Sequence, residues 1–181
     1  MIHEIKGNLL NTDCQYICHQ VNCQGVMGSG VAKAIREKWP IVYQKYQDWY
    51  TSYDTWAHAH RNDEYQYQPA DAMLGNIQVV ALYEKYDLLR ASEHQYVINM
   101  AAQNGYGYDG KRYTSYDAFW SCLGKIRDTV PKGSSIAFPG QIGCVRGGAN
   151  WDVIKNMIEV VLGKDYEVYI YYLEGKENEK H

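Results

Sequence analysis

Long apolar runs, a surplus of positive charge and a secretion signal are all missing from this chain of 181 residues. A membrane-spanning helix needs about 18 or more consecutive apolar residues, and the sequence has no such run. The opening MIHEIKGNLL lacks the cationic flank and long apolar core of a secretory signal. The net charge of -3 is not that of a dedicated nucleic-acid binder. We therefore expect a cytoplasmic protein without a membrane partner, and the charge argues against nucleic acid as a partner.

The cysteines show no disulfide pattern. There are 5, an odd number, without regular spacing, at Cys14, Cys18, Cys23, Cys122 and Cys144. Free thiols in a reducing compartment fit this pattern. The stretch CQYICHQVNC gathers three thiols and one imidazole, which leaves a zinc site as an alternative. Because a strand directs Cys18 and His19 to opposite faces, and because no C-x-x-C pair is present, we expect no metal site and no cofactor.

Two common phosphate-binding signatures are also missing. No G-x-x-x-x-G-K-[ST] occurs, which argues against a P-loop. GSGVAK does not fulfil the Rossmann fingerprint, because Lys33 stands where a third small residue should allow close helix packing. What the chain does have is NCQGVMGSGVAKAI, with Gly25, Gly28 and Gly30 directly before a helix-forming stretch. Glycines at a helix start predict a tight loop whose amides hold an anion.

Strand-like and helix-like segments alternate along the chain. The strand candidates are Ile2–Lys6, Tyr16–Asn22, Ile77–Tyr83, Tyr96–Ala101, Ser135–Pro139 and Glu167–Leu173. One helix follows the glycines and ends at Trp39, and Pro40 opens another that runs through Trp49. Two further helix candidates are SYDAFWSCLGKIRDTV, capped by Thr114 or Ser115, and NWDVIKNMIEVVLG, capped by Asn150 and ended by Gly163. This alternation predicts an α/β sandwich with a largely parallel central sheet.

Residues 51–73 interrupt the alternation. They are polar and aromatic, show no sustained period, and predict a functional or mobile insertion. Within them we expect His58 and His60 to be surface residues on a strand or extended loop rather than metal ligands. EGKENEKH predicts a charged, frayed terminus. The predicted domain therefore spans residues 1–175, with a charged tail at 176–181.

A second glycine cluster lies late in the chain, in PGQIGCVRGGANW. It also follows a strand and precedes a helix. Loops that leave the carboxyl ends of parallel strands emerge at the same edge of the sheet, where open α/β sheets bind ligands. Two such loops together can surround a diphosphate with backbone N–H groups and helix N-termini. Turn formation alone is the alternative reading of either cluster.

Several segments, taken in order, resemble one known family. GNLL after the first strand, ICHQVNCQGVMGSGVAKAI, INMAAQNGYGYDGKRYTSYDAF, PGQIGCVRGGANW and the closing VYIYYL are similar to macro domains, the ADP-ribose-binding fold. The similarity covers nearly the whole chain apart from residues 51–73. It is closest to the branch with the yeast ADP-ribose 1''-phosphate phosphatase and the human terminal ADP-ribose glycohydrolase. It implies a three-layer α/β/α sandwich, with a mixed, largely parallel sheet, that binds ADP-ribose or a derivative.

The resemblance also implies ligand contacts. Asn8 stands where macro domains usually have an aspartate for the adenine amino group, and Tyr171 or Leu173 would lie beside the adenine. Sheet packing is the alternative role of these tyrosines. Asn22 matches the asparagine that contacts the distal ribose. The two diphosphate loops correspond to Gly28, Ser29, Gly30 and Val31, and to Ile142, Gly143, Cys144, Val145, Arg146 and Gly147.

A third loop of the family faces the distal ribose. Here it contains NGYGYDGKRYTSY, so that Tyr106, Tyr108 or Asp109 would cover this site. Lys111 and Arg112 are expected to be solvated rather than catalytic.

The catalytic residues of the family are only partly matched. The human glycohydrolase-like members use a lysine nucleophile and an aspartate in the second loop, but Gly147 stands at the aspartate position and INMAAQ contains no lysine. His19 matches a histidine of the yeast phosphatase-like members. It would act as general acid or base beside the distal ribose, with Asn22 orienting water or a ribose hydroxyl. A hydrogen-bonded interior histidine is the alternative reading.

The sequence therefore leaves two functions open. One is a metal-independent hydrolase of an ADP-ribose derivative, either ADP-ribose 1''-phosphate or an ADP-ribosylated protein. The other is a non-catalytic module that binds ADP-ribose or a related NAD metabolite. A redox enzyme is opposed by the broken dinucleotide fingerprint.

Overall fold

The computed structural model describes residues 1–82 and 94–174. The predicted strand end Tyr83 and the predicted tail lie outside the described residues. The described strands are β1 (Ile2–Lys6), β2 (Tyr16–Val21), β3 (Ile77–Ala81), β4 (Tyr96–Ala101), β5 (Ser135–Pro139) and β6 (Glu167–Tyr172). The described helices are η1 (Leu9–Asn11), α1 (Gly30–Lys38), α2 (Pro40–His60), α3 (Ala70–Met73), α4 (Tyr116–Thr129) and α5 (Trp151–Leu162). The predicted strands are confirmed. β2 and β6 end one residue earlier than expected, and β3 ends at Ala81, so that Leu82 already lies outside the strand.

These strands form one sheet in the order β1-β6-β5-β2-β4-β3. All neighbouring pairs are parallel except β3 and β4, which are antiparallel. The carboxyl ends of β1, β6, β5, β2 and β4 therefore share one edge, which we call the carboxyl edge. The predicted mixed, largely parallel sheet is confirmed.

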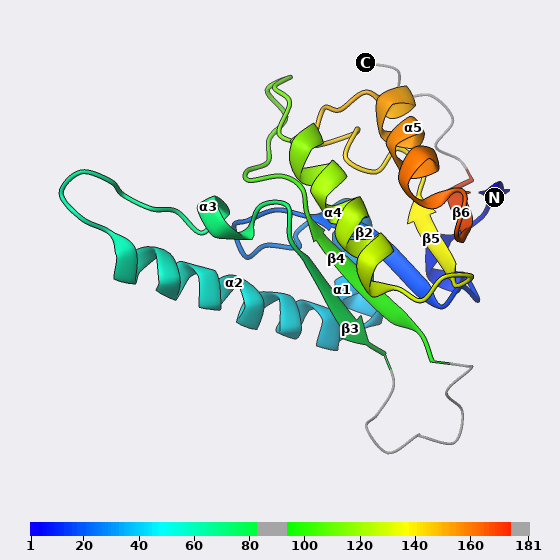
Figure 1. The fold of residues 1–181 in the computed structure, drawn as a ribbon, viewed down its shortest axis with the longest axis horizontal. Coiled ribbons are helices and arrows are strands. Elements are labelled where there is room, and N and C mark those ends of the chain that lie inside the picture. The colour runs from blue at the N-terminus through cyan, green and yellow to red at the C-terminus, as the bar shows by residue number, and fades with distance from the viewer. Residues whose placement is uncertain (83–93, 175–181) are drawn as a thin grey trace.

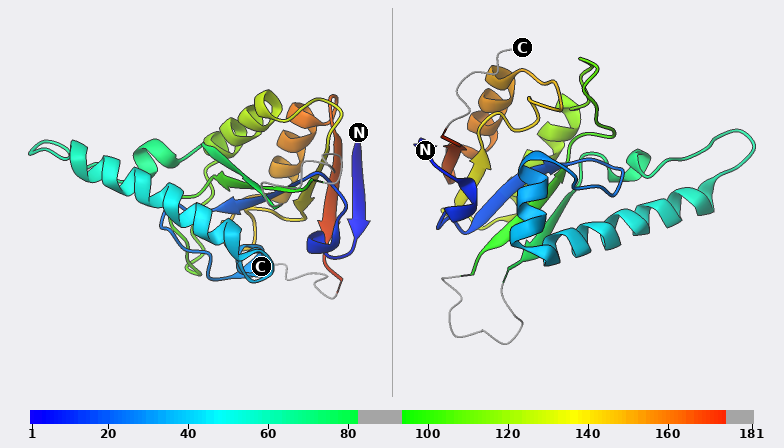
Figure 2. Two further views of the ribbon diagram at one scale, coloured as in Figure 1. Left: turned by 90° about the horizontal axis from the view of Figure 1, so that it is seen from below. Right: turned by 180° about the vertical axis from the view of Figure 1, so that it is seen from behind.

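Helices cover both faces of this sheet, with α4 and α5 on one face and α1 and α2 on the other (Figures 1 and 2). The side chains of β2 alternate between the two layers. Cys18 lies in a core that includes Phe119 of α4 and Ile158 of α5. Ile17 lies in a second core that includes Tyr46 of α2. Each face of the sheet is thus buried, which explains why β2 and β4 have apolar side chains on both faces.

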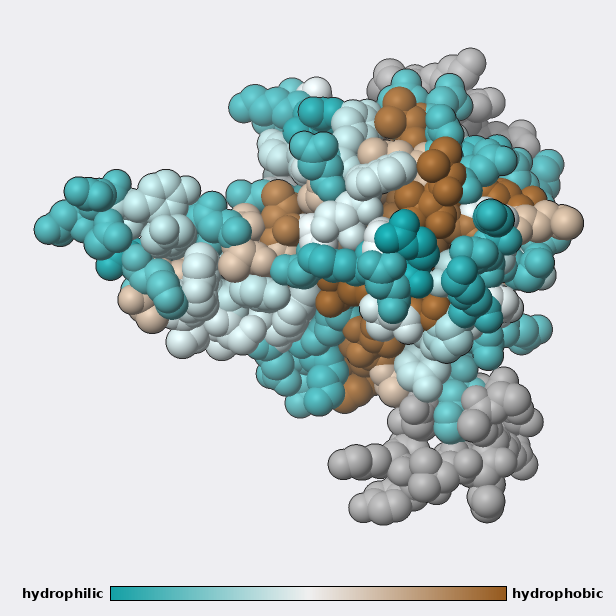
Figure 3. Space-filling model, in the orientation of Figure 1, coloured by the Kyte–Doolittle hydropathy of each residue, from teal (hydrophilic) through white to brown (hydrophobic). Residues whose placement is uncertain are grey.

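Helix α2 departs from the expectation for residues 51–73. The predicted irregular stretch is helical as far as His60, and a short helix occupies residues 70–73. The second half of α2 projects beyond the sheet, and the following segment folds back along it (Figure 1). In Figure 3 this projection is mostly teal and pale, so its surface is hydrophilic to intermediate in hydropathy. Because its packing partners are aromatic residues of its own segment rather than the sheet, no single apolar stripe appears in the sequence.

The aromatic contacts in this projection are specific. Trp56 meets Tyr67 edge to face, with ring centroids 5.4 Å apart, and Ala57 beside it is fully buried. His58 and His60 are exposed, as expected, but they lie in the last turn of a helix rather than on an extended loop. Each bonds through Nδ1 to the carbonyl oxygen four residues earlier.

None of the helices formed by residues 1–82 and 94–174 is long and apolar enough to cross a membrane.

The N-cap of α5 provides a test of the fold. Asn150 Oδ1 accepts hydrogen bonds from the amides of Asp152 and Val153, at 2.9 and 3.3 Å. Asn150→Ala should lower the free energy of unfolding by about 1 kcal/mol, because these amides lose their acceptor. Asn156→Ala, at an exposed mid-helix position, should leave it unchanged or slightly raised, because alanine favours the helix. Equal losses for the two variants in urea denaturation would contradict this account.

Candidate functional site

Two glycine-rich loops meet at the carboxyl edge. Loop 1 (residues 22–29) joins β2 to α1, and loop 2 (residues 140–150) joins β5 to α5. Because β2 and β5 are neighbouring parallel strands, both loops leave the sheet at the same place. The guanidinium of Arg146 in loop 2 donates a hydrogen bond to the hydroxyl of Ser29 in loop 1. The predicted convergence of the two glycine clusters is therefore observed.

Loop 1 presents free amides at the start of α1. Ser29 is the N-cap residue, but its side chain accepts no bond from the first turn of the helix. Within the described part of the chain, the N–H groups of Gly30, Val31 and Ala32 have no hydrogen-bond acceptor. Such groups carry the positive end of the helix dipole, and they favour an anion.

Loop 2 presents a second set of free amides. Among the described residues, no acceptor is bonded to the N–H groups of Gly143, Val145, Arg146 or Gly147. Successive free amides in a turn form a concave donor surface for anions. Arg146 adds a full positive charge between this set and the start of α1.

Asn22 shapes loop 1 through its side chain. Its Oδ1 accepts a bond from the amide of Gln24 at 3.0 Å, and its Nδ2 donates to the carbonyl of Val26 at 2.8 Å. The hydroxyl of Tyr46 lies 2.7 Å from the same Oδ1 and 2.8 Å from the carbonyl oxygen of Asn22. Burial raises the pKa of Tyr46, so the hydroxyl stays protonated as a donor. The predicted ribose contact of Asn22 remains a prediction, because its hydrogen bonds here are used within the loop.

A second tyrosine of α2 also supports loop 1. Gly25 has a φ of 74°, and a Cβ placed on it would lie 2.8 Å from the ring of Tyr50. A side chain here would therefore meet both backbone strain and a clash. Sequence reasoning singled out the glycine but missed both tyrosines. It placed Tyr46 in a helix without a further role, and it ended that helix at Trp49, before Tyr50.

Gly147 occupies the most crowded point of loop 2. Its carbonyl accepts bonds from the amides of Tyr113 and Thr114, at 2.8 and 2.9 Å. A Cβ at this position would lie 2.0 Å from Oγ1 of Thr114 and 2.3 Å from the carbonyl oxygen of Gly143. This loop conformation therefore has no room for the aspartate found at the matching position of some macro domains.

The tyrosine loop (residues 102–115), which joins β4 to α4, completes the edge. Its Tyr108 ring lies over the guanidinium of Arg146, 4.3 Å from centroid to Cζ. Gln24 of loop 1 donates to the side-chain oxygen of Asn104 at 2.9 Å. Thr114 donates to the carbonyl of Gly143 in loop 2 at 2.7 Å. These contacts join the tyrosine loop to loops 1 and 2. The sequence resemblance placed Arg146 in the second diphosphate loop, but it did not reveal the contacts of Arg146 with Ser29 and Tyr108.

The predicted adenine-binding residues lie at the β1–β6 end of the edge. Asn8 is exposed, and its Oδ1 caps η1 by accepting a bond from the amide of Leu10 at 2.9 Å. Tyr171 is half-buried, and its hydroxyl accepts a bond from Thr12 at 3.0 Å. Leu173 follows β6 and is 53% exposed.

The remaining predicted residues of loop 2 differ in exposure. The side chain of Ile142 is buried in the core between the sheet and α4 and α5. Burial raises the pKa of the Cys144 thiol to about 12, so this thiol is not a nucleophile at neutral pH. Val145 is 74% exposed. The backbone amides of Ile142 and Cys144 donate to the carbonyl oxygens of Pro139 and Gln141, so these two residues shape loop 2 rather than offer it free donors.

His19 lies inside the fold rather than at the loops. It is 1% exposed, and its Nε2 is 2.5 Å from Oδ1 of Asn99 on β4. Burial lowers the pKa of the imidazole to about 4, which keeps it neutral at physiological pH. The predicted role of His19 as acid or base beside the distal ribose is not supported by this position. The interior alternative fits the geometry.

The tautomer of His19 is fixed by a chain of hydrogen bonds. Gln78 Nε2 donates to the carbonyl of Lys45 at 2.8 Å, so Oε1 of Gln78 accepts from Nδ2 of Asn99 at 3.0 Å. Asn99 Oδ1 then accepts from His19, which must carry its proton on Nε2. The Nδ1 atom of His19 is a buried acceptor without a donor among the described residues.

The described residues contain no group of three or more His, Cys, Asp and Glu side chains that could hold a metal ion. Cys18 packs in the core on the α4 and α5 side. His19, the next residue on the strand, points to the opposite face.

No family model matches the chain. A curated protein of Thermus aquaticus, "DNA ADP-ribosyl glycohydrolase", is 23% identical over 180 residues, which are 99% of this chain and 43% of that protein. The chain thus spans less than half the length of this relative.

Two solved structures have a similar fold. The macrodomain of Mycobacterium tuberculosis DarG matches with a TM-score of 0.67 and 20% identity, over 94% of this chain and 97% of that one. The structure of Thermosipho africanus DarTG in complex with ADP-ribose matches with a TM-score of 0.70 and 20% identity, over 98% of this chain and 43% of that one. The chain therefore has the fold of macrodomains. The narrower likeness to the yeast phosphatase and human glycohydrolase remains a prediction.

The buried imidazole predicts a pH dependence of stability. Between pH 6.5 and 4, His19 is protonated in the unfolded chain but stays neutral in the folded chain. The free energy of unfolding should therefore fall as the pH is lowered. The loss from this residue is about 3 kcal/mol. His19→Gln keeps a donor for Asn99 but has no group that titrates. In urea denaturation at a series of pH values, its free energy of unfolding should fall by about 3 kcal/mol less than that of the wild type as the pH is lowered.

His58→Gln is the matched control, because His58 is exposed at the end of α2. Its pH profile should follow the wild type. Identical profiles for all three proteins would show that His19 is not held neutral by the fold.

Proposed function

We propose that this chain, which has the macrodomain fold, binds ADP-ribose along its carboxyl edge, with the diphosphate between loops 1 and 2. The observation that carries the proposal is the pairing of two sets of free amides around Arg146. They belong to Gly30, Val31 and Ala32, and to Gly143, Val145, Arg146 and Gly147. Each set suits one phosphate group.

Electrostatics support an anionic ligand at this place. A cation beside a helix N-terminus is unfavourable by roughly 0.3–1 kcal/mol, because both carry positive charge. Arg146 nevertheless reaches across to the N-cap residue of α1. A diphosphate between the loops would compensate the helix dipole, the free amides and the guanidinium together.

The order of the strands suggests how the ligand lies. The adenine would bind at the β1–β6 end, near Asn8, Tyr171 and Leu173. The diphosphate would follow at the loops after β5 and β2. The distal ribose would then point toward the loop after β4. This direction agrees with the contacts that the sequence resemblance implies.

Binding is tested by calorimetry with ADP-ribose, with adenosine as a ligand that lacks phosphate. The wild type should bind ADP-ribose near micromolar affinity, about -8 kcal/mol. Arg146→Ala should weaken ADP-ribose about tenfold or more, because one charge-assisted hydrogen bond is lost, and should leave adenosine binding unchanged.

Arg127→Ala is the control for charge, because Arg127 lies in the last turn of α4 and bonds to Asp128. It should bind like the wild type. Absence of any heat with ADP-ribose would refute the proposal.

Hydrolysis of an ADP-ribosyl bond is a second candidate function. It is favoured by the relative whose name is "DNA ADP-ribosyl glycohydrolase". In such a reaction the bond from C1'' of the ribose to the attached group breaks. Water supplies a hydroxyl to C1'' and a proton to the leaving atom. We do not assign this chemistry to His19, because its imidazole is buried and neutral.

Release of ADP-ribose from an ADP-ribosylated oligonucleotide or peptide, followed by chromatography, tests this candidate. Release of phosphate from ADP-ribose 1''-phosphate tests the phosphatase alternative. If either reaction occurs, His19→Gln should retain its rate within about threefold, because the imidazole is 1% exposed and is bonded to Asn99 inside the fold. A loss of two orders of magnitude or more in a folded variant would restore His19 to the mechanism, and no release in any assay would indicate a binding module.

A further inference from the structure

We propose that Tyr46 of α2 is a positioning residue of the candidate site, whose buried hydroxyl holds Asn22 ready to bond the distal ribose of a bound ADP-ribose. The inference rests on the proposed function, because it concerns one end of the same ligand. It goes further by naming a residue of a neighbouring helix that sets the preference for ADP-ribose over ADP.

The hydroxyl of Tyr46 is a polar group at the end of a fully buried side chain. The ring packs in the core that includes Ile17 and Val21 of β2. Burying a hydroxyl costs free energy unless the group forms hydrogen bonds. A phenylalanine would fill the same space without that cost. The hydroxyl is therefore explained by the acceptors that it meets, and both of them belong to Asn22.

This one hydroxyl contacts Asn22 at two points. It lies 2.7 Å from Oδ1 of the side chain and 2.8 Å from the main-chain carbonyl oxygen. Because a carbonyl oxygen can only accept, the hydroxyl of Tyr46 is the donor in both contacts. A single group thus fixes the side chain of Asn22 relative to its own backbone.

The amide of Asn22 is left with one donor to offer. Its Oδ1 also accepts from the amides of Gln24 and Val26, at 3.0 and 3.4 Å. Its Nδ2 donates one hydrogen to the carbonyl of Val26 at 2.8 Å. Among the residues that the structure describes, nothing accepts the second hydrogen of Nδ2. Asn22 is only 9% exposed, and a donor so nearly buried favours an acceptor that a ligand brings.

The place of Asn22 in the sheet assigns this acceptor to the distal ribose. Asn22 directly follows β2, and the amide of Cys23 bonds to the carbonyl of Asn104 in the tyrosine loop at 3.0 Å. Asn22 therefore lies at the side of loop 1 that faces the loop after β4. With the adenine near β6 and the diphosphate between loops 1 and 2, the distal ribose reaches this point. Its hydroxyl oxygens can accept the free hydrogen.

The amides that suit the diphosphate are held by other contacts. Met27, in the second half of loop 1, is fully buried in the same core as Tyr46. The hydroxyl of Ser29 accepts a hydrogen bond from Arg146 of loop 2. Loss of the Tyr46 hydroxyl should therefore change residues 22–26 and leave the start of α1 in place. This separation predicts an effect on recognition of the ribose without an equal effect on the diphosphate.

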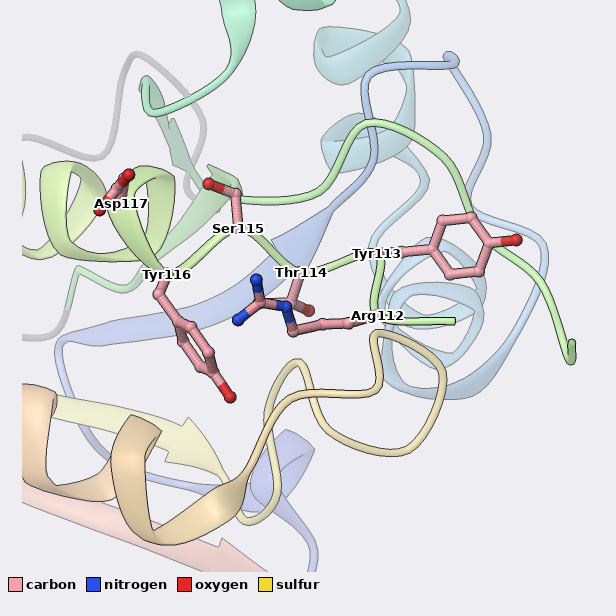
Figure 4. A pocket seen from close by; sticks show the side chains of 6 residues that line it. All are labelled: Arg112, Tyr113, Thr114, Ser115, Tyr116 and Asp117. Carbon is pink, nitrogen blue, oxygen red and sulfur yellow. The ribbon is translucent and has the colours of Figure 1, made fainter. Parts of the chain in front are cut away.

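A hollow of about 360 Å³ at the base of the tyrosine loop is a different place (Figure 4). Residues 112–117 line it, and it lies at the start of α4, which covers the face of the sheet opposite to α2. Arg112 lies over the ring of Tyr116, 4.4 Å from Cζ to the centroid, and Figure 4 shows the two side by side. Asp117 lines the same hollow and compensates the charge of Arg112. Since loop 1 does not line this hollow, the distal ribose is assigned to Asn22.

Calorimetry with ADP-ribose and with ADP tests the proposal, because ADP has the adenine and the diphosphate but lacks the distal ribose. The measured quantity is the ratio of the two affinities in each protein. Tyr46→Phe keeps the ring and removes the hydroxyl, so it should weaken ADP-ribose about fivefold and leave ADP unchanged. Asn22→Ala should lower the ratio by at least as much. In the double variant Tyr46→Phe should cause no further loss, because it acts through Asn22.

Tyr43→Phe is the matched control, because the hydroxyl of Tyr43 bonds to Gln47 of the same helix rather than to loop 1. Its ratio should equal that of the wild type. A hydroxyl that only stabilises the fold would lower the free energy of unfolding of Tyr46→Phe in urea denaturation but leave the ratio unchanged, which would overturn the proposal.

Two further results would also overturn it. One is a double variant whose loss of binding free energy equals the sum of the two single losses. The other is an unchanged ratio in Asn22→Ala, a result that can be measured even if Tyr46→Phe does not fold. Failure of ADP-ribose to bind the wild type would instead refute the proposed function, which separates the two outcomes.

Discussion

The parallel pairing of β2 with β5 is the constraint on which the candidate site depends. Residues 22–29 and 140–150 lie more than a hundred positions apart in the chain, and only this strand pairing brings them to one edge. The side-chain contact between Arg146 and Ser29 is made possible by it. The amides of both loops can serve one ligand because the sheet fixes their separation before any ligand arrives.

Much of this arrangement could be predicted from the sequence. Alternating strands and helices give the layers, and glycines after two strands mark the loops. The strands themselves are predictable because β2, β4, β5 and β6 are largely buried and contain β-branched and aromatic residues. The starts of α4 and α5 are also predictable, because Ser115 and Asn150 cap these helices through side-chain bonds to residues close in sequence.

What escaped prediction depends on contacts between distant segments. The burial of His19 follows from α1 and α2 covering that face of β2, which no local pattern reports. The end of α2 was missed because Trp56 packs on Tyr67 of the following segment, a contact that leaves no sustained apolar period in the sequence. A similar limit applies to charge. The net charge of -3 gave no sign that folding would place Arg146 between Ser29 of loop 1 and Tyr108 of the tyrosine loop.

The hydrogen bonds that end at His19 have a direction. The backbone carbonyl of Lys45, on a surface helix, can only accept, and this one fact orients the amides of Gln78 and Asn99 in turn. The location of a proton in the centre of the protein is therefore set three groups away. If an apolar side chain replaced Gln78, the amide of Asn99 would be free to rotate by half a turn. It would then offer its NH₂ group to the ring, and the imidazole would hold its hydrogen on the other nitrogen.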